Sequence, residues 1–327
     1  MPFLILNLFF GLLFFGLFFS QKKDSSINLI SRDHLKEYVF TSPILDCEEV
    51  SGVGSTAVPY KEANEEIKKI ADKYNLSNLS LYFRDLNNGQ WIGVNEKEYF
   101  SPASMLKIPL VISLFKWAEK DPSILNKEIL VESKFFDDNL SQHTNIIEGV
   151  KLGEKYTFYE IATKTIQQSD NVATKILYEN IPQNFIDDTY TNIGVPFIDS
   201  GEDFLIRVKD MASFYRVLFN ASYLNRENSE KTLAILSKTS YKDGIVNGVP
   251  KDVAVAHKFG ERFSSILVTP SMLIPEGDIQ LHDCGIVYVP NRPYILCVMT
   301  RGKDFKLQQQ AIGEVSKLIY EKVTKNN

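Results

Sequence analysis

The sequence predicts an α/β (α+β) protein in which both ends of the chain contribute strands to one antiparallel sheet. Three observations lead to this expectation. Strand patterns occur at about residues 79–94 and again after residue 250, the stretch from about 103 to 236 is mainly helical in pattern, and each end of the globular part carries an amphipathic helix. A chain of 327 residues that is 44% hydrophobic can bury a large core around such a sheet.

The N-terminal residues 1–20 are apolar and carry no charged side chain. Residues 3–19 are at the short end of the length that a transmembrane helix needs. No small-residue cleavage motif precedes Gln21 and no cysteine follows the apolar run, so we expect an uncleaved anchor, with a removed signal segment as the alternative. The lysines after the run, Lys22 and Lys23, lie on the side that the positive-inside tendency would keep cytoplasmic, and they do not settle the orientation.

Residues 21–58 are polar and rich in serine and glycine, which predicts a linker or a loosely docked segment before a globular domain at 59–327. Apolar residues then recur at helical spacing from Ala63 to Tyr74. Two strands are expected at 79–84 and 90–94, joined by a turn at Asn87, Asn88 and Gly89.

The helical block begins with an apolar helix after Pro102, continues around residues 161–178, and includes a helix at 211–218 that leads into more helix. Strands are expected at 253–259, 284–289 and 294–299, and a proline-containing turn at 290–293 separates the last two. A final helix carries apolar residues on one face between Leu307 and Ile319.

Charge and cysteine content exclude several classes of function. The net charge is −5 and no basic stripe is present, so nucleic acid is not expected as a partner. The sequence has no CxxC motif and its four histidines are scattered, which gives no support for a metal site. Cys284 and Cys297 fall on strands expected to pair, so a cross-strand disulfide is compatible with the pattern. Two buried thiols are the favoured interpretation, because cysteine is commonly buried as a small apolar residue.

Ser104 and Lys107 form an S-x-x-K motif at the start of the helix that follows Pro102. Residues three apart lie on the same face of a helix, so the hydroxyl and the amine come within reach of each other. A serine hydroxyl becomes a good nucleophile when a base takes its proton, and a lysine held below its usual pKa can be that base. The motif alone is weak evidence, because Ser113 with Lys116 also fits it.

Two further motifs follow in a fixed order. Ser169, Asp170 and Asn171 form an S-D-N sequence between helices, and Lys258 and Gly260 form a K-x-G sequence at the end of a β-rich run. K-x-G is a common pattern by itself. The combination of S-x-x-K at a helix start, S-D-N between helices and K-x-G on a late strand is typical of class A β-lactamases and penicillin-binding proteins.

On these motifs the chain resembles the class A β-lactamase-like, penicillin-recognising serine hydrolases over about residues 60–325. Further similarity lies at 85–89, 243–250 and 283–287. The resemblance implies a β-lactamase/DD-peptidase-like fold, with a five-stranded antiparallel sheet flanked by helices and an all-helical subdomain at about 103–236. It also implies an acyl-serine intermediate and no cofactor.

The resemblance assigns a role to each motif residue. Ser104 would attack the carbonyl, and Lys107 would act as the base or as part of a proton relay. Ser169 would pass a proton to the leaving nitrogen, and Asn171 would hold Lys107 and the substrate amide. Lys258 would supply positive charge that lowers the pKa of Lys107 and attracts a substrate carboxylate.

The backbone N–H groups of Ser104 and Glu261 would form the oxyanion hole, and Gly260 would line the substrate site. The family's third motif usually has threonine where this chain has Phe259, so carboxylate recognition must differ here. Arg262 is the residue near enough in sequence to compensate.

A second departure concerns hydrolysis of the acyl-enzyme. The E-x-x-L-N pattern that supplies the deacylating glutamate in class A β-lactamases is absent between residues 194 and 210. Glu202 is the candidate base there, with Asp199 and Asp203 as the other nearby carboxylates. The competing interpretation is that all three are solvated loop residues, as loop acids commonly are.

The expected function is therefore hydrolysis of a β-lactam or a related amide by a serine hydrolase. The alternatives are a D-Ala-type cell-wall peptidase or other amide hydrolase, and an acylable or catalytically silent protein that binds ligands in the same pocket. By analogy with the family, the catalytic domain is expected outside the cytoplasmic membrane, anchored by residues 3–19, or secreted if residues 1–20 are removed. The sequence does not predict the oligomeric state.

Overall fold

The computed structural model describes residues 38–42, 58–136, 148–196, 198–199, 204–263, 268–269, 272–273 and 278–325. The predicted anchor at 1–20, most of the predicted linker at 21–58, and the candidate base Glu202 lie outside these residues. Among the helices that the structure describes, none combines the length and the apolar character that a membrane crossing requires.

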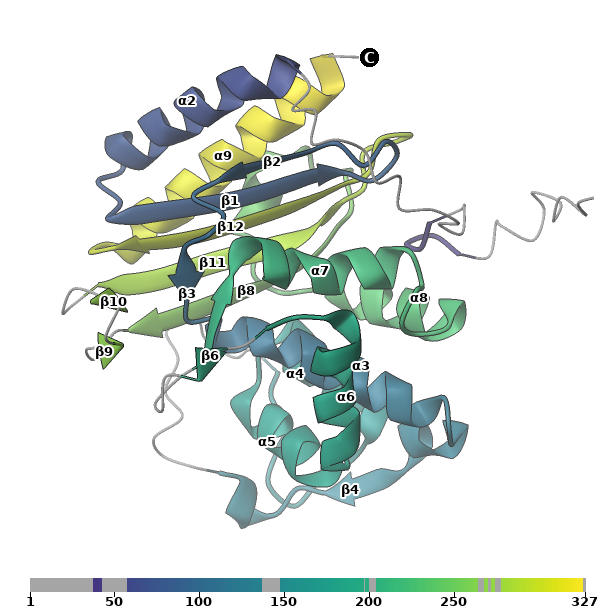
Figure 1. Cartoon of the computed structure of the whole chain (residues 1–327). Helices are drawn as coiled ribbons and strands as arrows, with labels where there is room; N and C mark the ends of the chain where they lie inside the picture. The colour runs from purple at the N-terminus through teal and green to yellow at the C-terminus, as the bar shows by residue number, and fades with distance from the viewer. Residues whose placement is uncertain are drawn as a thin grey trace, which may run out of the picture. The chain divides into compact units, whose positions relative to one another are not determined.

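The centre of the structure is a five-stranded antiparallel sheet (Figure 1). Its strand order is β2-β1-β12-β11-β8. The strands are β1 (Asn78–Asp85), β2 (Trp91–Val94), β8 (Val255–Phe263), β11 (Ile279–Val287) and β12 (Tyr294–Gly302). The N-terminal strand β1 pairs directly with the C-terminal strand β12, which confirms that the two ends of the chain share one sheet.

Two helices cover one face of this sheet, α2 (Val58–Lys73) and α9 (Phe305–Lys325) (Figure 1). Alternate strand residues such as Leu81, Phe83 and Val298 point to this face and join the helices in one apolar core. The helical periodicity read from Ala63 onward therefore reflects the buried stripe of α2.

The other face of the sheet packs against the helical block, which supplies α3 (Lys107–Ala118), α4 (Phe158–Gln167), α5 (Asn171–Asn180), α6 (Gln183–Ile193), α7 (Val208–Phe219) and α8 (Arg226–Leu236). Helix α7 contacts β1, β11 and β12, and α8 contacts β8. The helical pattern predicted at 161–178 is divided between α4 and α5. The break falls at the S-D-N motif because Asp170 accepts hydrogen bonds from the backbone N–H groups of Val172 and Ala173 and so caps α5.

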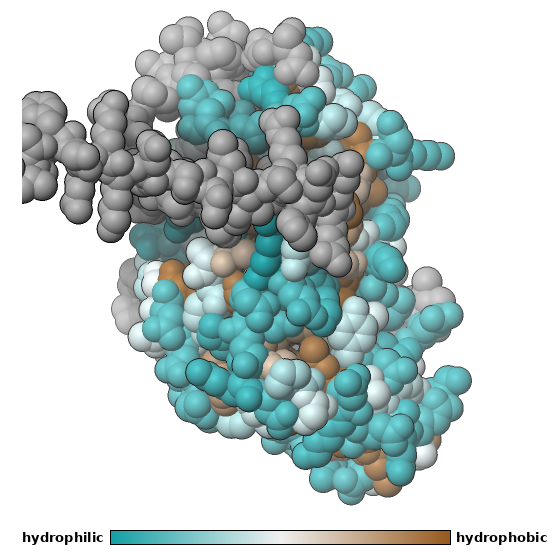
Figure 2. Space-filling view, turned by 90° about the vertical axis from the view of Figure 1, so that its right-hand side faces the viewer, coloured by the Kyte–Doolittle hydropathy of each residue, from teal (hydrophilic) through white to brown (hydrophobic). Residues whose placement is uncertain are grey.

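Shorter elements connect these layers: β3 (Tyr99–Phe100), β4 (Glu128–Leu130), β5 (Lys155–Thr157), β6 (Ile198–Asp199), β7 (Phe204–Arg207), β9 (Val268–Thr269) and β10 (Met272–Leu273), with 3₁₀ turns η2 (Ala103–Leu106), η3 (Pro122–Asn126), η4 (Ser133–Phe135) and η5 (Ile245–Gly248). The described surface on the side shown in Figure 2 is mainly hydrophilic, and its hydrophobic residues are scattered in small spots.

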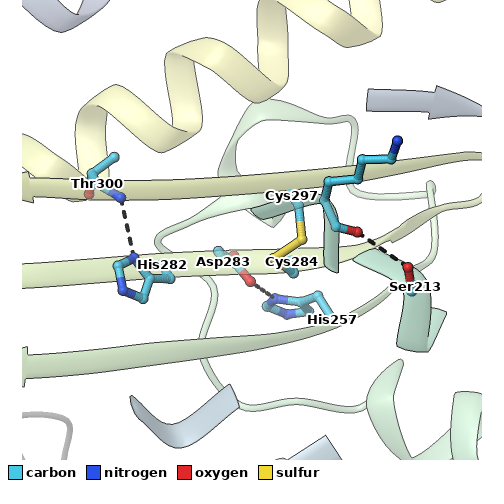
Figure 3. The surroundings of a disulfide bond; sticks show 8 residues. Ser213, His257, His282, Asp283, Cys284, Cys297 and Thr300 are labelled. Carbon is cyan, nitrogen blue, oxygen red and sulfur yellow. Dashed lines mark hydrogen bonds and ion pairs between the residues drawn. A yellow bond between two sulfur atoms is a disulfide. The ribbon is translucent and has the colours of Figure 1, made fainter. Parts of the chain in front are cut away.

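Cys284 and Cys297 form a disulfide between β11 and β12 (Figure 3), so the favoured interpretation of two free thiols is wrong. The two residues are direct partners in the register of the antiparallel pair, and their Cα atoms are 4.0 Å apart. Cysteines directly opposite each other on neighbouring strands point to the same face of a sheet. The tendency of cysteine to be buried carries no information about this register.

Residues 38–42 lie within the predicted linker but belong to the same compact unit as the rest of the described chain. The Glu230 carboxylate accepts hydrogen bonds from the backbone N–H groups of Val39 at 2.6 Å, Phe40 at 2.8 Å and Thr41 at 2.8 Å. The Arg226 guanidinium donates to the Thr41 hydroxyl on the same segment. Residues 38–42 are therefore tied to the surface of the domain by hydrogen bonds to Glu230 and Arg226.

Candidate active site

Ser104 lies in the 3₁₀ turn η2, immediately before α3 begins at Lys107. A 3₁₀ helix has three residues per turn, so side chains three apart are aligned more closely than in an α-helix. Ser104 is partly exposed and Lys107 is buried. The turn starts at Ala103, whose φ of 49° is in the left-handed region. The S-x-x-K motif thus combines a partly exposed serine with a buried lysine.

Strand β8 packs directly against this turn, and Gly260 is the residue that allows the close approach. A Cβ atom at position 260 would lie 2.6 Å from the carbonyl oxygen of Pro102 and 3.3 Å from the backbone nitrogen of Met105. Glycine is required where two backbones come this close. The K-x-G motif is therefore adjacent to Ser104, as the order of the motifs predicted.

The Ser169 hydroxyl lies between two lysine amines. The Lys107 Nζ donates to the Ser169 Oγ at 3.1 Å, and the Lys258 Nζ donates to the same oxygen at 3.0 Å. The Lys107 amine also donates to the Asn171 Oδ1 at 2.7 Å and to the Ser169 carbonyl oxygen. The structure therefore brings Lys107, Ser169, Asn171 and Lys258, which come from all three motifs, into one hydrogen-bonded cluster, and the Ser104 hydroxyl is not part of these hydrogen bonds.

The S-D-N turn is held in place by its own aspartate. Ser169 has a φ of 56°, an uncommon conformation for a residue with a side chain. The next residue, Asp170, caps α5 and also accepts a hydrogen bond from the backbone N–H of Val150 at 2.7 Å. Asp170 is buried and braces the turn.

Burial changes the electrostatics of both lysines. Desolvation lowers the pKa of Lys107 to about 7, against the opposing effect of the Asp170 and Glu261 carboxylates. Desolvation also lowers the pKa of Lys258, and the nearby charge of Lys107 lowers it further. The resemblance implied that the charge of Lys258 would lower the pKa of Lys107, and burial was the other cause expected for such a lysine. In the structure the cause is burial, and it leaves much of Lys107 neutral at pH 7.

Two polar residues of β11, which the motifs in the sequence did not identify, hold the segment that leads into Ser104. Gln280 accepts a hydrogen bond from the backbone N–H of Ser101 at 3.1 Å. The His282 Nε2 lies 2.9 Å from the carbonyl oxygen of the same residue. Burial lowers the pKa of His282 to about 3, so the ring is neutral and Nε2–H donates to this oxygen. Both peptide groups of Ser101 are thus fixed three residues before Ser104.

A second buried pair lies in the strand segment next to Lys258. The His257 Nδ1 is 2.8 Å from the Asp283 Oδ1, and both side chains are fully buried (Figure 3). The other carboxylate oxygen of Asp283 accepts a hydrogen bond from the backbone N–H of Ile245 at 2.8 Å. The pair connects β8, β11 and η5. In the sequence, His257 was one of four scattered histidines, and only the register of β8 against β11 reveals its partner.

The remaining predicted residues follow Gly260 on β8. Glu261 and Arg262 are partly buried, and their roles in the oxyanion hole and in carboxylate binding stay predictions. Phe259 is buried and stacks on Tyr241, with ring centroids 4.2 Å apart. Its ring lies 4.0 Å from the Lys258 Nζ. No group of potential metal ligands occurs among the residues that the structure describes.

This arrangement of fold and site defines a serine enzyme of the penicillin-recognising type. The chain belongs to the beta-lactamase enzyme family, whose family model matches residues 62–323. It is therefore a serine hydrolase of the β-lactamase family, and the family it resembles by its motifs is confirmed.

Solved structures show the same fold. A class A β-lactamase from Bacteroides cellulosilyticus DSM 14838 is 18% identical, with a TM-score of 0.69 over 82% of this chain and 99% of that chain. A point mutant of PBP-A, solved as its acyl-enzyme complex with penicillin G, is 20% identical, with a TM-score of 0.67 over 81% and 97%. A class A β-lactamase from Mycobacterium abscessus is 18% identical, with a TM-score of 0.65 over 79% and 98%. No curated protein sequence matches the chain significantly.

Proposed function

We propose that Ser104 is acylated by β-lactams, with neutral Lys107 as the base, and that the acyl-enzyme is released slowly. One observation carries the first part of this proposal: the Ser169 hydroxyl is hydrogen-bonded to both lysines, and the pKa of Lys107 is about 7. A buried amine with this pKa is half neutral near physiological pH, which is the state that a general base needs.

In the proposed reaction the Ser104 oxygen attacks the β-lactam carbonyl and its proton passes to Lys107. The negative charge that develops on the carbonyl oxygen is bound by the backbone N–H groups of Ser104 and Glu261. The amide C–N bond then breaks, and Ser169 gives its proton to the leaving nitrogen. Ser169 recovers a proton from the protonated Lys107, to which it is hydrogen-bonded. The products are an ester on Ser104 and a ring-opened amine, and no cofactor is consumed.

Slow release follows from the missing E-x-x-L-N pattern. Without this pattern, the chain lacks the glutamate that class A β-lactamases use for deacylation at this place in the sequence, and Glu202 is the remaining candidate base. The same absence favours a second candidate function, a D-Ala-type peptidase, in which a peptide substrate acylates the same serine. We further propose that the domain acts outside the cytoplasmic membrane, anchored by residues 3–19, because penicillin-like and cell-wall substrates are found there.

The test is a pair of measurements on the purified protein. A fluorescent penicillin should label the wild-type protein and leave the Ser104→Ala variant unlabelled. Nitrocefin should give a burst of one equivalent followed by slow turnover. Equal labelling of the variant would remove Ser104 from the chemistry. Rapid steady turnover without a burst would contradict slow deacylation and would leave acylation at Ser104 intact.

A further inference from the structure

The backbone turn that carries Ser104 depends on support from its surroundings. No side chain caps the start of η2 at Pro102, and the next residue, Ala103, has a φ of 49°. A left-handed conformation is unfavourable for a residue with a Cβ atom and persists where neighbouring structure fixes it. Strand β8 supports one side of the turn at Gly260. The contacts of Ser101, one residue before Pro102, supply further support.

Two side chains of β11 fix both peptide groups of Ser101. The Gln280 Oε1 accepts a hydrogen bond from the Ser101 backbone N–H at 3.1 Å, and the His282 Nε2 is 2.9 Å from the Ser101 carbonyl oxygen. Gln280 and His282 are two residues apart on one strand, so they point to the same face of the sheet. His282 is also the register partner of Gly260. Neighbouring positions of β8 and β11 therefore both contact the segment that contains the turn.

The sheet also fixes the ring of His282. The Thr300 backbone N–H donates to the His282 Nδ1 at 3.2 Å (Figure 3), so the hydrogen of the neutral ring is on Nε2 and is donated to Ser101. The ring packs edge-on against Phe100, with ring centroids 5.4 Å apart. His282 is fully buried. The donor that holds the Ser101 oxygen therefore has one tautomer and little freedom to move.

Gln280 uses only half of its amide group. The residue is fully buried and its Oε1 accepts from Ser101, but its Nε2 has no hydrogen-bond partner among the residues that the structure describes. An unmet amide donor in a buried position destabilises the folded state. What Gln280 supplies, and an apolar side chain of the same length could not, is the acceptor for the Ser101 N–H.

The residues just before Ser101 are fixed by the next strand, β12. The Arg301 guanidinium donates to the Glu98 carboxylate at 2.8 Å and to the Tyr99 carbonyl oxygen. It also lies 4.2 Å from the centroid of the Phe100 ring. Each residue from 98 to 101 is thus in contact with the sheet, and the chain enters the turn in a defined direction.

We propose that Gln280 and His282 are positioning residues for Ser104. By fixing the peptide groups on both sides of Ser101, they hold Ala103 in its left-handed conformation and keep Ser104 where it attacks the carbonyl. This inference rests on the proposed acylation of Ser104. A displacement of about 1 Å can lower the rate of a reaction about 100-fold, so loss of either hydrogen bond should slow acylation and leave the first binding of the ligand intact.

The test measures labelling by a fluorescent penicillin at several concentrations, which separates the dissociation constant of the first complex from the rate constant of acylation. Gln280→Met keeps the length of the side chain and removes the acceptor. We expect the rate constant to fall about 10- to 100-fold, and the dissociation constant to change less than about twofold. The matched control is Gln308→Met on α9, where an equally buried glutamine accepts from the Thr300 hydroxyl at 2.8 Å. This control loses a buried hydrogen bond of the same kind and should acylate at the wild-type rate.

Two variants at position 282 separate the hydrogen bond from packing. His282→Gln retains an N–H donor that can reach the Ser101 oxygen, whereas His282→Met is of similar length and has none. Both lose the ring contact with Phe100. The glutamine variant should acylate about fivefold faster than the methionine variant, the effect of one hydrogen bond. Equal rates would show that His282 only fills space.

Phenylboronic acid reports on Ser104 independently of β-lactam chemistry, because it bonds reversibly to a serine oxygen and contains no amide. Suppose that penicillin does not label the wild type, that the boronic acid binds the wild type but not Ser104→Ala, and that Gln280→Met alone weakens this binding. The proposed substrate is then wrong and the positioning role stands. Equal slowing of acylation by Gln280→Met and Gln308→Met, or no slowing by Gln280→Met, would overturn the positioning role and leave the proposed function intact. Failure of both probes on the wild type would overturn both.

Discussion

The pH dependence of acylation is the most direct consequence of the buried Lys107 amine. The pKa of this group is lowered to about 7 by burial, while the Glu261 carboxylate acts in the opposite direction. In the proposed reaction the neutral amine is the active form, so acylation should increase as the pH rises through this value. Replacing Glu261 by glutamine removes the carboxylate charge, and the inflection should move to lower pH.

The expected size follows from the titration of a single group. With a pKa of about 7, the neutral fraction rises from about 10% at pH 6 to about 90% at pH 8, so the rate should increase roughly ninefold. An ordinary lysine, with a pKa of about 10.4, would have a neutral fraction below about 0.1% at pH 7 and would give a rate still rising above pH 9.

The assay is the single-turnover rate of acylation by nitrocefin between pH 5 and pH 9. Glu227→Gln on α8 is the matched control, because it removes an exposed carboxylate that pairs with Lys231 and has no contact with the cluster. A change that only loosened the fold would lower the rate at every pH without moving the inflection. A flat profile, an inflection above pH 9, or an equal shift in Glu227→Gln would refute the role given to Lys107.

Three other perturbations test separate parts of the structure. Lys258→Met should lower the acylation rate at least tenfold while the free energy of unfolding, measured in urea, falls by no more than about 1 kcal/mol, because the replaced amine is buried at a cost. Gly260→Ala should lower both stability, by about 1–3 kcal/mol, and labelling by fluorescent penicillin, since its Cβ would lie 2.6 Å from the Pro102 oxygen. Replacing Cys284 and Cys297 by alanine should cost about 3 kcal/mol, as expected for a bridge between residues 13 apart, and a reductant should lower the wild-type unfolding midpoint but not that of the double variant.

The sequence predicted the helices and strands whose apolar residues lie on the faces that the structure buries. Strand β12 was expected at 294–299 and spans Tyr294–Gly302, and its residues are buried on both faces. Strand β11 was expected to begin at 284 but begins at Ile279. The missed part contains Gln280, His282 and Asp283, which are polar and fully buried. Their burial depends on partners elsewhere in the chain, which hydropathy along a single strand cannot reveal.

The catalytic cluster was predictable for a different reason. Three motifs in a fixed order identify the family, and the family's fold brings them together. The protonation of the lysines was not predictable in the same way, because it depends on how completely the amines of Lys107 and Lys258 are withdrawn from water. The cross-strand disulfide likewise required the register of β11 against β12.

Under the proposed mechanism, the replacement of threonine by Phe259 separates activation of Ser104 from recognition of the substrate. The Lys258 amine donates to the backbone carbonyl of Phe259 at 2.9 Å and to Ser169, and both contacts are independent of the side chain at position 259. The Phe259 ring lies over the Lys258 Nζ and is fixed by stacking on Tyr241. It offers no hydrogen bond to a carboxylate. In the proposed reaction the hydrogen bonds of Lys258 are therefore retained, while the threonine hydroxyl that the resemblance assigns to binding of the substrate carboxylate is missing, and selectivity for the acyl group must come from other residues.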